Sequence, residues 1–172
     1  YSFGDTRVTI LARMQKKMEI NLREAWSKRD RTIPIKNVYD ALKLASIIEK
    51  ETAKREERFL IASVFANRLK KKMRLQSDPT VTYGRSRSDL SRPISRADLK
   101  RKTPHNTYIV RGLPKTPICN PGAASIEAAL NPARTDFFYF VAKGSGLHSF
   151  SKTLVEHNKN VRKWRSMRQK LK

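Results

Sequence analysis

The chain of 172 residues has one cysteine, Cys119, and only three histidines, His105, His148 and His157. A single cysteine excludes an internal disulfide, and the histidines do not show the spacing of a zinc motif. No phosphate cradle accompanies a candidate Schiff-base lysine, as a pyridoxal-phosphate enzyme would require. The sequence therefore predicts neither a metal nor another cofactor.

Long hydrophobic runs are also missing. No apolar stretch approaches the roughly 18 residues of a membrane span, and no signal-peptide pattern precedes the first helical segment. With 38% hydrophobic residues, 6 glycines and 8 prolines, the chain is neither low-complexity nor disordered. We expect one globular domain, residues 1–172, that is a piece of a longer protein because it begins at Tyr1.

Acidic residues are scarce. Fifteen Asp and Glu stand against 38 Lys and Arg, which gives a net charge of +23. Such a charge attracts polyanions of any kind, including nucleic acid, acidic lipid and anionic cell-wall polymer. No motif for reading nucleic acid is present, which disfavours that partner. Because the cations concentrate at residues 85–102 and 159–172, we expect these two segments to attach the protein to an anionic wall or membrane face.

Helical periodicity dominates residues 1–72. It predicts a first helix from an N-cap at Asp5 to before Pro34, a second from about Val38, and a third from about Glu57 to Leu69. The second and third are expected to pack as a helical hairpin.

Beyond this part, the pattern of residues 73–150 favours short strands and ordered loops, with a short helix at 123–130 and a β-hairpin turning at 143–146. A capping-box pattern at Thr153 and Glu156 predicts a last helix in the basic segment 151–172. The predicted class is α+β, with a helical hairpin as core and the strands and loops forming a cleft.

Two carboxylates follow the apolar run of the second helix. Glu49 and Glu51 point about 160° apart on a helix, so they cannot share one site. Glu51 has Arg55 four residues later, and an ion pair would keep it charged. Glu49 has small neighbours and no cation at that spacing, so partial burial would raise its pKa. The pattern favours Glu49 as a general acid, although a solvated helix glutamate is the ordinary alternative.

Polar and aromatic residues cluster in three loops. The stretch LQSDPTVTYG places several hydroxyl, amide and ring groups beside a proline, and HNTYIVRGLP and PICNPG repeat the mixture. Such loops can present side chains to a sugar, or they can simply form Asx turns. The candidate substrate-binding residues are Gln76, Asp78, Thr80, Tyr83, Asn106, Tyr108 and Asn120.

A family resemblance covers most of the chain from about Leu42 to Asn160. The blocks LASIIEKET, VFANRLKKKMRLQSDPTVTYG, SRADL, NTY, GLPKTPICNPG, SIEAALNPA and FFYFVAKGSGLHSFS occur in order. They resemble the catalytic domain of the YceG-like endolytic murein transglycosylases, the MltG family.

The resemblance implies a lytic transglycosylase, a lyase that cuts the MurNAc-GlcNAc bond within peptidoglycan strands and leaves a 1,6-anhydro-MurNAc end. Glu49 would act first as acid and then as base. Family members carry an upstream membrane anchor and a LysM-like module. These imply a location on the periplasmic side of the inner membrane and a role in cell wall biogenesis, with peptidoglycan synthases of the elongation machinery as candidate partners.

Two alternatives stay open from the sequence. A lysozyme-type muramidase would use the same acid together with a second carboxylate, for which Asp78 is the candidate. A polyanion-binding or nucleic-acid-binding module would account for the charge without any catalysis.

Overall fold

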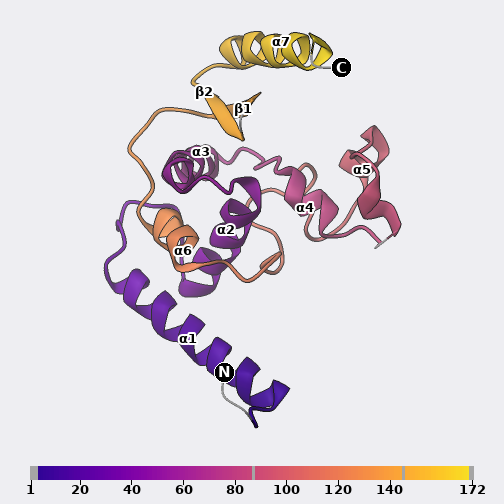
Figure 1. The fold of residues 1–172 in the computed structure, drawn as a ribbon. Coiled ribbons are helices and arrows are strands. Elements are labelled where there is room, and N and C mark those ends of the chain that lie inside the picture. Colours follow the sequence, from indigo (N-terminus) through magenta and orange to yellow (C-terminus); the bar gives the residue numbers. More distant parts are fainter. Residues whose placement is uncertain (1–3, 87, 145, 171–172) are drawn as a thin grey trace.

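The computed structural model describes residues 4–86, 88–144 and 146–170. Figure 1 shows a helical centre with α1 (Arg7–Ser27) extending from one end and α7 (Leu154–Lys170) lying at the other. A two-stranded antiparallel sheet separates α7 from the centre. The class is α+β, as predicted.

The hydrophobic core joins α2 (Val38–Glu51), α3 (Arg58–Lys70) and α6 (Ala123–Leu130). Helix α2 begins at the N-cap Asn37, whose Oδ1 accepts a hydrogen bond from the backbone N–H of Asp40 at 2.8 Å. Because apolar residues recur at helical spacing, one side of each helix can be buried together. The largest fully buried side chains of these helices are Leu44, Ile47, Ile48, Ile61, Val64, Phe65, Ile126 and Leu130.

Helix α1 differs from the prediction at its N-cap and ends before Pro34 as predicted. Its N-cap is Thr6, whose hydroxyl accepts the Thr9 N–H at 3.1 Å, and it ends at Ser27, well before Pro34. Only the second half packs on the core, through Leu22 and its neighbours, while Val8 is 75% exposed. The chain then turns, and the Asp30 N–H donates to the Leu130 carbonyl at the end of α6.

Strands predicted between residues 73 and 122 are absent from the part of this segment that the structure describes. The segment forms short helices, α4 (Asp78–Thr82), the 3-10 turn η2 (Ser88–Ser91) and α5 (Arg96–Lys100), joined by loops. A capping box between Ser95 and Asp98 starts α5. Short polar side chains that bond nearby backbone groups favour such turns over strands.

The predicted hairpin is confirmed as β1 (Tyr139–Gly144) and β2 (Leu147–Ser151), with an irregularity between Ala142 and Gly144. Gly144 and Gly146 have φ values of 101° and 70°, which glycine adopts readily. Ser145, in the predicted turn, lies outside the described residues.

The two faces of the hairpin contact different helices. Phe140 meets the ring of Phe65 of α3 edge-on at 5.8 Å. On the other face, Tyr139 stacks on His157 of α7 at 5.2 Å. Since alternate residues of a strand point to opposite faces, β1 is held between α3 and α7.

Helix α7 begins with the predicted capping box. The Glu156 N–H donates to Thr153 Oγ1 at 3.2 Å, and Glu156 Oε2 accepts the Thr153 N–H at 3.4 Å. Asn160 then donates to Ser151 Oγ at 3.0 Å, which fastens the helix to β2.

Candidate active-site pocket

A pocket of about 470 Å³ lies between the C-terminal end of α2, the loop before α4, the hairpin and the first turn of α7. It is lined by Glu51, Arg68, Leu75, Gln76, Asp78, Tyr108, Tyr139, Phe140, Val141, Ala142, His148, Leu154 and His157. Its walls therefore come from segments far apart in the sequence, and the one glutamate among these lining residues is Glu51.

Glu51 is the last residue of α2, and the chain turns to an extended conformation at Thr52. Ser77 donates its hydroxyl to Glu51 Oε1 at 2.5 Å. Burial raises the pKa of Glu51 to about 7, and the nearby carboxylate of Asp78 acts in the same direction. The Ser77 hydrogen bond and the charge of Arg68 oppose the rise without cancelling it. Glu51 can therefore hold a proton near neutral pH.

Arg68 connects the helical core with the strand that covers the pocket. Its Nε donates to the carbonyl of Phe138 and its Nη1 to that of Leu75, both at 2.7 Å. Its guanidinium lies 5.3 Å from the ring centre of Tyr139. These hydrogen bonds hold the entry to β1 against the end of α3.

Glu49 does not line this pocket. Its Oε2 accepts the Gly122 N–H at 3.1 Å and the Ser125 hydroxyl at 2.6 Å, and Arg58 lies 3.8 Å from its other oxygen. Burial alone would raise the pKa of Glu49, but these hydrogen bonds and the Arg58 charge outweigh it and lower the pKa. The carboxylate fastens α2 to the N-terminus of α6, where negative charge is stabilised.

Both premises that favoured Glu49 from the sequence are therefore wrong. The pKa of Glu49 is lowered rather than raised. Among the described residues Glu51 forms no ion pair with Arg55, because α2 ends at Glu51 and Arg55 belongs to the separate turn η1 (Arg55–Glu57). Glu51 instead lines the pocket and accepts the hydroxyl of Ser77.

Three predicted substrate-binding residues do meet in the pocket: Gln76, Asp78 and Tyr108. Tyr108 donates its hydroxyl to Asp78 Oδ1 at 2.6 Å, which joins the start of α4 to a loop thirty residues later. Burial, followed by this bond to Asp78, raises the pKa of Tyr108. Gln76 has a φ of 51°, an uncommon conformation for a residue with a side chain.

The other four predicted residues do not line the pocket. Thr80 and Asn106 are buried and bind the backbone, Thr80 to the Ser77 carbonyl and Asn106 to those of Asp98, Leu99 and Arg101. Tyr83 is half exposed against His105, and Asn120 is exposed in the loop before α6. The backbone hydrogen bonds of Thr80 and Asn106 fit the turn alternative.

Sequence patterns do not single out Arg68, His148 or His157 as pocket residues. His148 pairs with Glu57 of η1, and His157 reaches the pocket from α7. Both imidazoles come from the last quarter of the chain. A lone histidine in a strand or helix carries no recognisable spacing, so only the tertiary fold reveals these residues.

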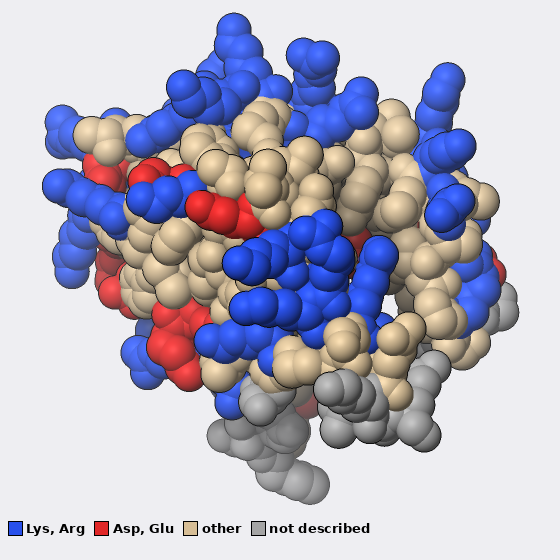
Figure 2. All heavy atoms as spheres, turned by 90° about the horizontal axis from the view of Figure 1, so that it is seen from above, with Lys and Arg blue, Asp and Glu red and all other residues tan. Residues whose placement is uncertain are grey.

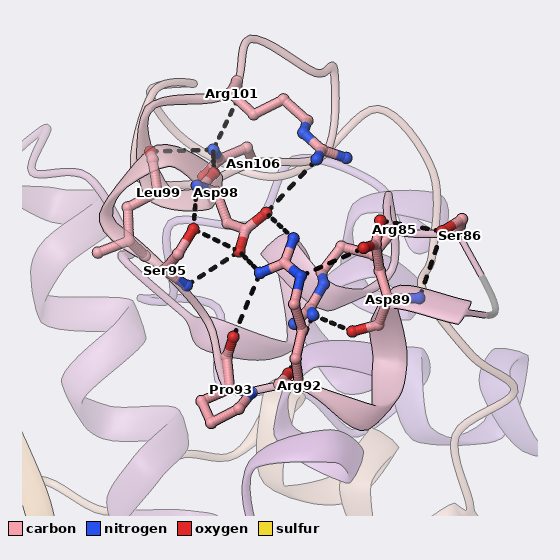
Figure 3. Close-up of polar contacts among 10 residues, drawn as sticks. All are labelled: Arg85, Ser86, Asp89, Arg92, Pro93, Ser95, Asp98, Leu99, Arg101 and Asn106. Carbon is pink, nitrogen blue, oxygen red and sulfur yellow. Dashed lines mark hydrogen bonds and ion pairs between the residues drawn. The ribbon is translucent and has the colours of Figure 1, made fainter.

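The basic segment 85–102 is tied into a polar cluster, shown in Figure 3. Arg92 donates to both carboxylate oxygens of Asp98, at 2.6 and 3.0 Å, and Arg101 lies 3.4 Å from the same group. Arg85 donates to the carbonyls of Asp89 and Arg92. Arg92 first, then Ser95, lower the pKa of Asp98 well below its ordinary value. At least three cations of the segment 85–102 therefore stabilise the segment itself. Arg87 lies outside the described residues.

Helix α7 carries exposed cations instead. Figure 2, seen from above, shows Lys and Arg side chains spread over this face of the molecule. The exposed basic residues of α7 include Lys159, Arg162, Lys163, Arg165 and Arg168. The same helix lines the pocket through Leu154 and His157, so these cations lie on an element that also contributes to the pocket.

Neither a membrane span nor a metal cluster occurs within residues 4–86, 88–144 and 146–170. No helix there is both long and apolar enough to cross a bilayer. No cluster of three or more His, Cys, Asp or Glu there could hold a metal ion.

Comparison with known proteins decides the family. The model of the YceG-like family matches residues 1–163. The chain belongs to the YceG-like family. The endolytic murein transglycosylase of Bacillus subtilis strain 168 is 48% identical over 128 residues, 74% of this chain and 35% of that protein. The protein of the same name from Streptococcus pneumoniae serotype 2 strain D39 is 35% identical over 161 residues, 89% of this chain and 28% of that protein.

A solved structure supports the fold. The crystal structure of a yceG-like protein from Listeria monocytogenes is 42% identical, with a TM-score of 0.76 over 92% of this chain and 52% of that one. The chain spans about a third of the length of the curated relatives it matches.

Proposed function

We propose that this YceG-like domain cleaves peptidoglycan glycan strands internally as a lytic transglycosylase, with Glu51 as its general acid. The observation that carries the proposal is the pocket itself. It holds one glutamate, whose burial raises its pKa to about 7, beside the polar groups of Gln76, Asp78 and Tyr108. The relatives named endolytic murein transglycosylase supply the substrate class.

In this mechanism Glu51 gives its proton to the glycosidic oxygen as the bond to C1 of the muramic acid breaks. The C6 hydroxyl of the same sugar then attacks C1, passes its proton to a base in the pocket and closes the 1,6-anhydro ring. A carboxyl whose pKa lies near the working pH can supply that first proton. Glu49 is held ionised by Ser125, Gly122 and Arg58, so it is poorly suited to this step.

A hydrolase of lysozyme type is the second candidate, because Asp78 lines the same pocket and could assist a water molecule. Asp78 is engaged by the Tyr108 hydroxyl at 2.6 Å, which makes it a poorer partner for water. A hydrolase would leave a reducing end in place of the anhydro end.

For the whole protein we propose a membrane anchor outside this chain that places the domain on the outer face of the cytoplasmic membrane. Peptidoglycan synthases of the elongation machinery are the proposed partners there. Both statements rest on the family, since the chain covers only part of its relatives.

The deciding experiment is mass analysis of the products that the purified domain releases from peptidoglycan. We expect 1,6-anhydro ends from the wild type and a loss of cleavage of at least about 100-fold in Glu51→Gln, because the amide keeps the shape but has no acidic proton. Glu49→Gln is the matched control and should retain cleavage as long as it is folded. Reducing ends would establish the hydrolase, and an active Glu51→Gln would refute the assignment of the acid.

A further inference from the structure

A buried carboxylate holds one histidine of the pocket in a fixed orientation. Glu57, only 4% exposed, makes two hydrogen bonds with His148: its Oε1 accepts the backbone N–H, and its Oε2 bonds ring Nδ1, each at 2.8 Å. Glu57 ends the turn η1 and His148 belongs to β2, so residues from the core and the hairpin meet in this pair. Both rotation of the ring and movement of the strand are restricted.

The pairing also determines which ring nitrogen carries the proton. An ionised carboxylate only accepts hydrogen bonds, so Nδ1 must be the donor. In the neutral imidazole Nε2 then has a free lone pair. No described residue hydrogen-bonds Nε2, and the side chain lines the same pocket as Glu51. This is the arrangement in which a carboxylate prepares an imidazole to act as a base.

The other histidine of the pocket lacks this arrangement. His157 stacks on Tyr139, and its Nδ1 is buried without a hydrogen-bond partner among the described residues. Burial, together with the charge of Arg68, lowers the pKa of His157. Within the described part of the chain no carboxylate orients this ring, so it can fill space or contact a sugar without being prepared to take a proton.

We propose that His148 is the base that takes the proton from the C6 hydroxyl of the sugar, and that Glu57 is its positioning residue. The inference rests on the proposed function and divides its two proton transfers between two residues. Glu51 protonates the oxygen of the breaking C1–O bond. The C6 oxygen forms the new bond to C1, and its proton moves to His148 Nε2. The step leaves Glu51 ionised and His148 protonated, and exchange with solvent restores both.

The charged and titratable groups around this site set its response to pH. Glu51, Arg68, Asp78 and Tyr108 face the pocket from the helical side, Tyr139 and His157 from the hairpin and α7, and Glu57 contacts the ring directly. Cleavage requires a neutral His148 and a protonated Glu51. The rate should therefore fall toward low pH as the base is protonated and above about pH 7 as the acid ionises.

The test uses His148→Asn, because the asparagine amide can keep the donor at the place of Nδ1 while Nε2 is removed. We expect kcat for glycan cleavage to fall by about 10²- to 10⁴-fold, the usual contribution of a general base, with glycan binding little changed. The residual activity should lose the decline toward low pH and keep the one above pH 7. His105→Asn is the matched control, because His105 bonds Thr116 outside the pocket and should leave both declines unchanged.

Glu57→Gln tests the positioning role. The glutamine carbonyl can accept the backbone N–H of His148, but its NH₂ group would then face Nδ1 and force the ring proton onto Nε2. Cleavage should fall by a similar factor although both pocket side chains, Glu51 and His148, are still present. A wild-type ¹⁵N spectrum of the imidazoles gives the tautomer directly, and we expect the proton on Nδ1 of His148.

Three results would overturn the assignment: kcat of folded His148→Asn within about threefold of the wild type, a slowed variant that keeps the decline toward low pH, or a wild-type His148 with its proton on Nε2. The last measurement decides the matter even if the variants do not fold. Each of these would leave the transglycosylase standing. A wild type that does not cut glycan would remove the proposed function, and this assignment with it.

Discussion

At the scale of single residues, Glu49 and Glu51 acquire opposite acidities although one residue separates them. Glu49 receives two hydrogen-bond donors and a cation, all of which favour the charged form. Glu51 has one hydroxyl donor, a carboxylate neighbour and extensive burial, which together favour the neutral form. The first arrangement stabilises the fold, and the second keeps a proton available to a ligand in the pocket.

This difference predicts how stability changes with pH. Folding raises the pKa of Glu51 from 4.5 to about 7. The contribution of Glu51 to the free energy of unfolding is therefore fully present below pH 4.5 and is lost as the pH rises through 7. Glu51→Gln removes the ionisation. We expect the variant to match the wild type near pH 4 and to exceed it at pH 8 by about 1–3 kcal/mol in the free energy of unfolding. Urea unfolding at the two pH values measures the difference.

Glu49→Gln is the counterpart. Its lowered pKa contributes stability that is present above pH 4.5 and is lost as the pH falls through the lowered value. Loss of the charge at the N-terminus of α6 should lower the free energy of unfolding by about 1 kcal/mol at pH 7 and change it little at low pH. If both variants changed stability in the same direction at pH 8, the opposite environments described for the two carboxyls would be wrong.

At the scale of elements, the cluster of Figure 3 makes the basic segment a folded unit. Asp98 is 2% exposed. Its carboxylate pairs with Arg92 and Arg101 and accepts hydrogen bonds from the N–H and hydroxyl of Ser95. Asp98→Asn removes the charge that these donors share and should lower the Tm by several degrees. Arg96→Gln, an exposed change in the same helix, is the control and should leave the Tm unchanged. Equal effects of the two substitutions would show that the cluster does not stabilise the segment.

The elements that sequence periodicity predicted are those with local causes. The core helices have a continuous apolar side, the hairpin has a glycine-containing turn, and α7 has a capping box, so nearby residues determine each of them. The segment 73–122 is different. The N–H groups of Gln76 and Ser77 bond the carbonyl and hydroxyl of Thr107, about thirty residues away. No local pattern encodes such pairs, and for this reason its strands were wrongly predicted.

The pocket was only partly predictable for the same reason. The loop residues Gln76, Asp78 and Tyr108 were found because polar groups gather near a proline, a feature visible in the sequence. The position of Glu51 depends on α2 ending at this residue, and that of His148 on pairing with a glutamate 91 residues earlier. Helical spacing assumes that the helix continues, so it placed Glu51 beside Arg55 when the helix in fact stops.

At the scale of the whole molecule, the net charge of +23 concentrates in part on α7, beside the pocket. The hairpin side of this helix is fixed through His157 and Asn160, which leaves its basic residues directed to solvent. An anionic polymer lying along α7 would be close to the pocket that Leu154 borders. These charges can therefore hold such a polymer near the pocket without contacting the reacting atoms.

Substitutions on α7 alone can test this role of the basic surface. Changing Lys159, Arg162, Lys163 and Arg165 to glutamine should weaken binding to isolated cell walls at low salt, because fewer cations remain to displace counterions. The slope of the logarithm of the binding constant against the logarithm of the salt concentration should become shallower. The change should be about one unit for each cation that no longer pairs with an anionic group of the wall. Cleavage of a short soluble glycan should change little, since the substitutions leave the pocket residues in place.

The control replaces Arg7, Lys16, Lys17 and Arg23 of α1 by glutamine. It lowers the net charge by the same amount at the opposite end of the molecule. Wall binding in a pelleting assay at several salt concentrations should fall more for the α7 set than for the α1 set, because attraction between exposed charges extends over about one Debye length, roughly 10 Å at 0.1 M salt. Equal losses would mean that overall charge, not α7, binds the wall. If the folded α7 variant no longer cleaved the short glycan, the basic face would belong to the active site.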